Sequence, residues 1–113
     1  MEEMNKRERV LNAMNGKEVD HVPVGFWFHF EGDETKGDAC VEAHLKYYRE
    51  TDLDFVKIMS DGYFIYPFPE ITCAADWGKI EPIGRNHPYV REQVERAKKI
   101  VDRIGDERCV FYN

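Results

Sequence analysis

Hydrophobic and polar positions follow one another along the chain in a pattern that predicts short apolar strands separated by amphipathic helices. The first such segment, residues 5–14, places Val10, Leu11 and Met14 on one helical face. Asn5, followed three positions later by a glutamate, is typical of a helix N-terminus. We therefore expect a short amphipathic helix at the start of the chain.

Three later segments are apolar at successive positions instead of alternate ones. They are Val22–Phe28, Phe55–Met59 and Cys109–Tyr112. This pattern is typical of strands that are covered on both faces, as in a parallel sheet. The sequence thus predicts three strands, the third of which begins close to the last residue given.

Two amphipathic helices are expected between these strands. Val41, Leu45 and Tyr48 recur at helical spacing before the second strand. Pro88 can occupy the first turn of a longer helix. Its apolar positions rise in steps of four and three residues: Val90, Val94, Ala97, Val101 and Ile104. Between the second strand and this helix, prolines exclude regular structure from residues 63–69. The order of strand, helix and strand favours a parallel sheet with right-handed crossovers.

Composition and charge exclude several classes of protein. The net charge of −6, with basic and acidic residues interleaved, argues against a nucleic-acid partner. The run Val22–Phe28 is far shorter than the roughly 18 apolar residues that span a bilayer. The charged start, MEEMNKRERV, is unlike a secretory signal, so we expect a cytoplasmic protein without membrane contact. Cys40, Cys73 and Cys109 are odd in number and widely spaced, which favours reduced structural thiols.

The order of several segments resembles the beginning of the uroporphyrinogen decarboxylase superfamily, which includes decarboxylases and corrinoid methyltransferases. The segments that carry the resemblance are 5–11, 16–24, 52–61, 76–80 and the helix after Pro88. Together they cover nearly the whole chain. The resemblance implies an enzyme of porphyrin metabolism, a lyase or a methyltransferase, acting on a tetrapyrrole or corrinoid.

The same resemblance implies a fold, the N-terminal part of a (β/α)8 TIM-type barrel. Residues 1–20 would form a leading helix and turn, and residues 21–113 the first β/α units of a single barrel domain. A complete barrel takes about 250 residues, so three strands cannot close one. We therefore expect self-association or pairing with the missing C-terminal part of the barrel, and an isolated chain that is inactive. The alternative is a non-catalytic fragment that serves as an assembly or interaction module.

Asp61 is the candidate catalytic residue. It follows the second predicted strand, and barrel active sites lie at the C-terminal ends of strands. The resemblance implies that this aspartate bonds the pyrrole NH groups and stabilises a protonated intermediate, as a fixed carboxylate can. From the residues alone, an aspartate before glycine is as readily a turn or helix cap.

An arginine motif of the true decarboxylases is missing. The resemblance implies arginines after the first strand, yet Phe28 stands in place of the first of them and His29 in place of a glutamine, and no arginine lies between Arg9 and Arg49. Arginines bind substrate carboxylates through paired hydrogen bonds. Decarboxylation of a substrate rich in carboxylates is therefore doubtful, whereas corrinoid-linked methyl transfer does not need the motif, and both activities stay open. No cofactor is expected within this segment, while a corrinoid or zinc would belong to the complete protein.

His29 and Tyr63 are candidate substrate-binding residues. A histidine can donate to a ligand or exchange protons near neutral pH, although a hydrogen-bonded histidine at a barrel rim has the same sequence signature. Tyr63 begins an aromatic stretch that would wall a macrocycle pocket or pack without a ligand. The aromatic residues Phe26–Phe28 are interpreted as buried strand positions. Three further histidines have no metal-ligand spacing: His21, His44 and His87.

Overall fold

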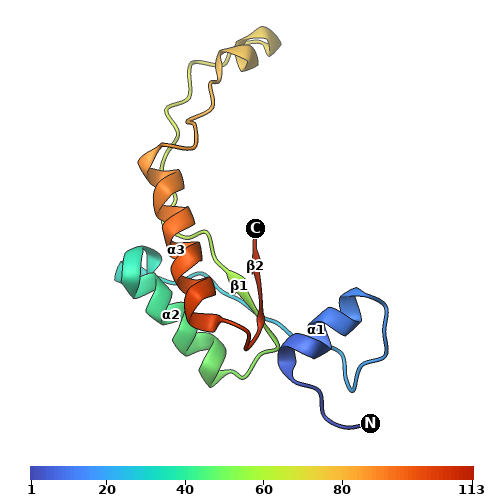
Figure 1. Cartoon of the computed structure of the whole chain (residues 1–113). Coiled ribbons are helices and arrows are strands. Elements are labelled where there is room, and N and C mark those ends of the chain that lie inside the picture. The colour runs from blue at the N-terminus through green and yellow to red at the C-terminus, as the bar shows by residue number, and fades with distance from the viewer.

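The computed structural model describes residues 1–113, and Figure 1 shows its α-helices around a small sheet. In chain order the elements are α1 (Lys6–Met14), the 3-10 helix η1 (Gly32–Thr35), α2 (Gly37–Glu50), β1 (Phe55–Ile58), the 3-10 helix η2 (Ala74–Lys79), α3 (Pro88–Ile104) and β2 (Cys109–Tyr112). The predicted helices at the start of the chain, before the second strand and after Pro88 are confirmed. No helix is both long enough and apolar enough to cross a membrane.

The sheet has two parallel strands, with Phe55 opposite Cys109 and Ile58 opposite Tyr112. The parallel arrangement was expected from the order of elements. The expected first strand, Val22–Phe28, is absent, and the chain is largely helical with only these two short strands. The prediction of the N-terminal part of a (β/α)8 barrel is therefore wrong: this is a small α/β fold.

The extended segment, residues 21–30, pairs with no strand, and Asp54 and Tyr48 bond some of its backbone groups instead. The backbone N–H of Val24 donates to the Asp54 carboxylate at 2.7 Å, and Asp54 N–H donates to the Val24 carbonyl at 2.9 Å. The Tyr48 hydroxyl lies 3.4 Å from the Phe26 carbonyl. These isolated contacts hold the segment beside β1 without a ladder of strand hydrogen bonds.

Gly25 allows this segment to approach β1 closely. A Cβ atom at this position would lie 2.1 Å from the ring of Phe55, so only glycine fits under the ring. The neighbouring aromatic residues Phe26–Phe28 are at least half exposed, which corrects their interpretation as buried core positions. Trp27 is covered in part by Lys57, whose Nζ lies 4.1 Å from the indole ring centroid.

The hydrophobic core lies where α2 and α3 pack against β1. Its fully buried members are Val41, Leu45, Tyr48, Val56, Ile58, Ile100 and Ile104. The spacing of Val41, Leu45 and Tyr48 had predicted the buried face of α2, and this face is confirmed. Asn5 caps α1 as expected, since its side chain accepts from the Glu8 N–H at 2.8 Å.

A buried ion cluster connects α1 to the rest of the fold. Arg9 donates to Asp20 at 2.7 and 2.8 Å and to Asp54 at 2.5 Å. The paired hydrogen bonds and charge of Arg9 hold the pKa of Asp20 well below its usual range. Because the Asp54 carboxylate also binds Val24, one cluster fixes both α1 and the extended segment.

The helix α3 presents an unexpected face to the core. Its predicted apolar stripe is only partly covered, with Val94 50% exposed and Val101 47% exposed. Polar residues are buried instead: Gln93 and Arg96 face α2 and the loops together with Ile100. The apolar stripe therefore lines an open surface groove, described below.

An arm, residues 62–87, projects from the body of the molecule and carries η2 (Figure 1). The arm gives the chain a radius of gyration of 18.2 Å, whereas about 13 Å is typical of a compact domain of this length. The arm is internally ordered, because the Tyr66 hydroxyl bonds the backbone of Glu81 on the returning segment. The irregular conformation expected for residues 63–69 is confirmed.

Candidate functional site

His29 and Asp61 form a hydrogen-bonded pair at the base of the arm. Nδ1 of His29 lies 2.6 Å from Oδ1 of Asp61. The other carboxylate oxygen accepts from the backbone N–H of Phe30 at 3.1 Å. Asp61 is 3% exposed, whereas the His29 side chain is 64% exposed. A buried carboxylate thus orients an imidazole that faces outward.

The pair determines which nitrogen of His29 carries the proton. An ionised carboxylate only accepts hydrogen bonds, so Nδ1 of His29 must be the N–H donor to Asp61. In the neutral ring, Nε2 is then left with a free lone pair. The arrangement presents a proton acceptor to the surface.

Tyr63 lies next to this pair. Its ring centroid is 6.5 Å from that of His29, and the side chain is exposed. The three residues proposed from the sequence are therefore neighbours. They differ from the expected arrangement in one respect, since the Asp61 carboxylate is directed into the chain and His29 is the group that faces solvent.

Two side chains of α3 hold the backbone at Asp61, and the sequence did not identify them. Gln93 Nε2 donates to the Asp61 carbonyl at 3.0 Å, and Arg96 Nη2 donates to the same oxygen at 2.9 Å. Arg96 also donates to the Thr35 carbonyl at 2.9 Å. Both side chains are almost fully buried. In the sequence, these two residues are recognisable only as polar residues three positions apart within an amphipathic helix.

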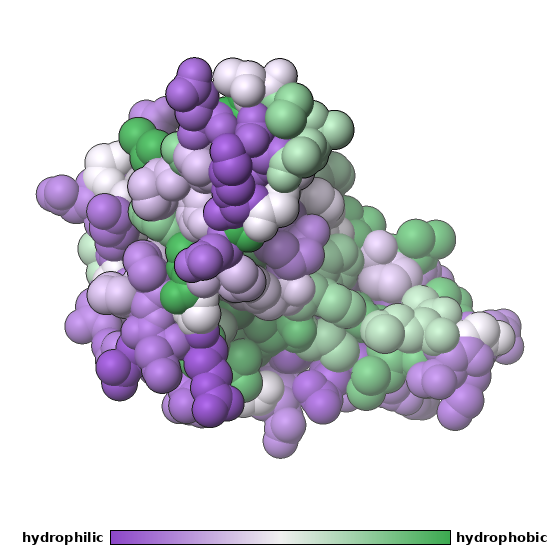
Figure 2. Space-filling view, turned by 90° about the horizontal axis from the view of Figure 1, so that it is seen from above, coloured by the Kyte–Doolittle hydropathy of each residue, from purple (hydrophilic) through white to green (hydrophobic).

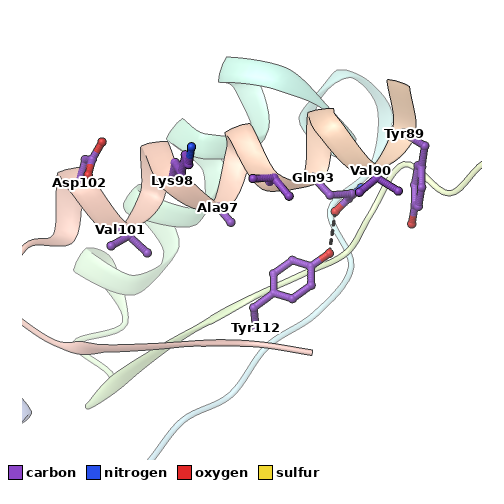
Figure 3. Close-up of a pocket in the computed structure, with 9 residues that line it drawn as sticks. Tyr89, Val90, Gln93, Ala97, Lys98, Val101, Asp102 and Tyr112 are labelled. Carbon is purple, nitrogen blue, oxygen red and sulfur yellow. Dashed lines mark hydrogen bonds between the residues drawn. The ribbon is translucent and has the colours of Figure 1, made fainter. Parts of the chain in front are cut away.

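An apolar groove runs beside this site, between α3 and β2. Its volume is about 480 Å³, and its lining residues are Tyr89, Val90, Gln93, Val94, Ala97, Lys98, Val101, Asp102 and Tyr112. Figure 3 shows Gln93, Ala97 and Val101 pointing from α3 toward the side on which Tyr112 lies. The Tyr112 hydroxyl donates to Gln93 Oε1 at 3.1 Å, and burial raises the pKa of Tyr112. Gln93 thus belongs both to the groove and to the support of Asp61.

A second polar cluster nearby is structural. His44 is fully buried, and its Nε2 accepts from the Met59 N–H at 2.9 Å. Burial lowers the pKa of His44 and raises that of the Cys40 thiol, which keeps both groups uncharged. No group of three or more His, Cys, Asp or Glu side chains is arranged to hold a metal ion.

Comparisons of the chain with protein-family models, with curated proteins and with solved structures found no match. The candidate site is consequently defined by its own geometry. It consists of an oriented and exposed imidazole, a buried carboxylate and an adjoining apolar groove. Such a combination is typical of sites that bind a largely apolar ligand and move a proton.

Proposed function

We propose that this chain contributes a tetrapyrrole- or corrinoid-binding site to an enzyme of the uroporphyrinogen decarboxylase superfamily. In this site His29 transfers protons and Asp61 orients it. The observation that carries the proposal is the 2.6 Å contact between the exposed imidazole and the buried carboxylate. The ordered segments that resemble the superfamily provide the substrate class.

The acid–base step uses Nε2 of His29. In its imidazolium form the ring donates the Nε2 proton to the bound ligand, and in its neutral form it takes a proton back. Asp61 accepts from Nδ1 during both steps and so leaves Nε2 to exchange protons with the ligand. In this proposal Asp61 acts through His29 instead of touching the ligand, because its two oxygens are already bonded to His29 and Phe30.

The groove supplies the binding surface. Its volume of about 480 Å³ falls within the range of roughly 300–1,000 Å³ that is usual for small-molecule sites. Tyr89 and Tyr112 would lie against the face of a macrocycle, and the valines of α3 would cover its apolar edge. The groove contains one cation, Lys98. A corrinoid or a tetrapyrrole with few carboxylates fits this composition better than a highly acidic porphyrinogen.

The test is an absorbance titration of the 113-residue chain with cobalamin and, separately, with a porphyrin. Saturable binding by the wild type is expected, with a clear loss of affinity in His29→Ala. The matched control is His21→Ala, because His21 is an exposed histidine of the same extended segment and bonds only the adjacent backbone. Absence of saturable binding by the wild type, or equal losses in the two variants, would overturn the proposal.

A second candidate function is an assembly module without catalysis, and exposed apolar side chains favour it. Figure 2 shows apolar residues gathered on the face seen from above. A second groove of about 490 Å³ brings together side chains of α1, the extended segment and β2, including Met14, Trp27 and Phe111. Sedimentation equilibrium at micromolar concentrations tests this candidate: it requires association, and a strictly monomeric chain would exclude it.

A further inference from the structure

Two hydrogen bonds lead from the groove to the backbone of Asp61, whose side chain in turn bonds His29. The Tyr112 hydroxyl donates to Gln93 Oε1 at 3.1 Å, and Gln93 Nε2 donates to the Asp61 carbonyl at 3.0 Å. The Asp61 carboxylate then accepts from Nδ1 of His29 at 2.6 Å. The four side chains come from β2, α3, the loop after β1 and the extended segment. Nothing in the acid–base step itself requires Gln93.

We propose that Gln93 is a positioning residue that keeps the Asp61 carboxylate aligned with His29 and links this alignment to the groove. An amide side chain is suited to the task because it donates on one side and accepts on the other. Gln93 is almost fully buried, so its hydrogen bond to the Asp61 carbonyl is shielded from competing water. A carboxylate or an apolar side chain at this position would leave the Asp61 carbonyl with one donor fewer.

Arg96 is the second donor to the Asp61 carbonyl, at 2.9 Å, and its role differs. It also bonds the Thr35 carbonyl and lies 3.0 Å from the Cys40 sulfur, so it connects α3 to η1 and α2. Its Nε has no partner. Replacing Arg96 would disturb several elements at once. Gln93 is therefore the side chain to replace in a test of how Asp61 is aligned with His29.

The proposal rests on the proposed function of His29, but its test needs no tetrapyrrole. Nitrogen-resolved NMR of the ligand-free chain measures the ratio of the Nδ1–H and Nε2–H tautomers of neutral His29. The wild type should favour Nδ1–H, because Asp61 accepts from that nitrogen. Gln93→Met should lower the ratio by about fivefold, which corresponds to ~1 kcal/mol, the net contribution of one hydrogen bond.

Two further variants make the result specific. Gln93→Glu retains the size of the side chain but removes the donor to Asp61, so it should lower the ratio as Gln93→Met does. Lys98→Met alters the same groove without any hydrogen bond to the pair and should leave the ratio unchanged. A wild-type ratio in both Gln93 variants, or an equal fall in Lys98→Met, would overturn the inference. Failure of the proposed function would appear separately, as a missing absorbance change in the ligand titrations.

Discussion

Replacing Tyr48 with phenylalanine removes the hydroxyl that connects the core to the backbone of β1. This hydroxyl accepts from the Lys57 N–H at 2.9 Å and lies 2.9 Å from the Lys57 carbonyl and 3.4 Å from that of Phe26. Tyr48 is 1% exposed, so water cannot replace the lost partner. An unsatisfied buried donor costs about 1–3 kcal/mol, which predicts a fall of ~2 kcal/mol in the free energy of unfolding.

The pH dependence of this effect provides a sharper test. Burial raises the pKa of Tyr48 from 10.0 to about 12. Below pH 10 the folded and unfolded chains both hold the phenolic proton. Between pH 10 and about 12 the unfolded chain loses this proton while the folded chain keeps it, so stability falls as pH rises. This linkage removes up to ~3 kcal/mol from the wild type and nothing from Tyr48→Phe.

Urea unfolding followed by circular dichroism at pH 8, 10 and 11 measures both effects in the two proteins. The wild type should be the more stable protein at pH 8, and the difference should shrink as the pH rises above 10. A constant difference at all three pH values, or a difference below about 0.5 kcal/mol at pH 8, would refute the assigned role of the Tyr48 hydroxyl.

Three other changes have expected outcomes. Arg9→Met leaves the buried Asp54 carboxylate with Lys6, 3.9 Å away, as its remaining cation and should lower the free energy of unfolding by on the order of 3 kcal/mol in urea titrations; an unchanged midpoint would contradict the ion cluster. Gly25→Ala should cost ~1–3 kcal/mol because its Cβ meets the Phe55 ring, and Phe55→Leu should recover part of the loss in a double-mutant cycle. Val94→Lys should weaken any concentration-dependent association seen by sedimentation, and equal association by the variant would place the contact elsewhere.

Helices whose apolar residues recur every three or four positions over several turns could be predicted from the sequence. The spacing of Val41, Leu45 and Tyr48 identified the buried face of α2. The length of α3 followed in the same way from Pro88 and the apolar repeat that ends at Ile104. In α2 the local pattern and the tertiary contacts agree.

Other features depend on tertiary contacts that periodicity does not encode. The apolar run Val22–Phe28 has the composition of a buried strand, but Asp54 and Tyr48 occupy its backbone groups, and its aromatic side chains remain exposed. The barrel prediction depended on that strand and failed with it. On α3, the buried side chains Gln93 and Arg96 were missed because polar residues are usually exposed.

The candidate site could be predicted in part. His29, Asp61 and Tyr63 were chosen for their positions after apolar segments, and they lie together at the base of the arm. Their arrangement could not be derived, because a sequence does not show that the carboxylate is directed inward and the imidazole outward. The supporting residues on α3 are more than 30 positions away in the chain from Asp61, and no local motif marks them.

The most direct test of the central claim is an NMR titration that follows His29 itself as cobalamin or a porphyrin is added to the chain. The account predicts that the Nε2 resonance of His29 shifts with saturation, while His21, exposed in the same segment, does not shift. It also predicts that Asp61→Asn abolishes the Nδ1–H preference of His29 in the ligand-free chain. A His29 signal that stays unchanged at saturating ligand, or that moves only in parallel with His21, would contradict the claim that this histidine faces the bound tetrapyrrole.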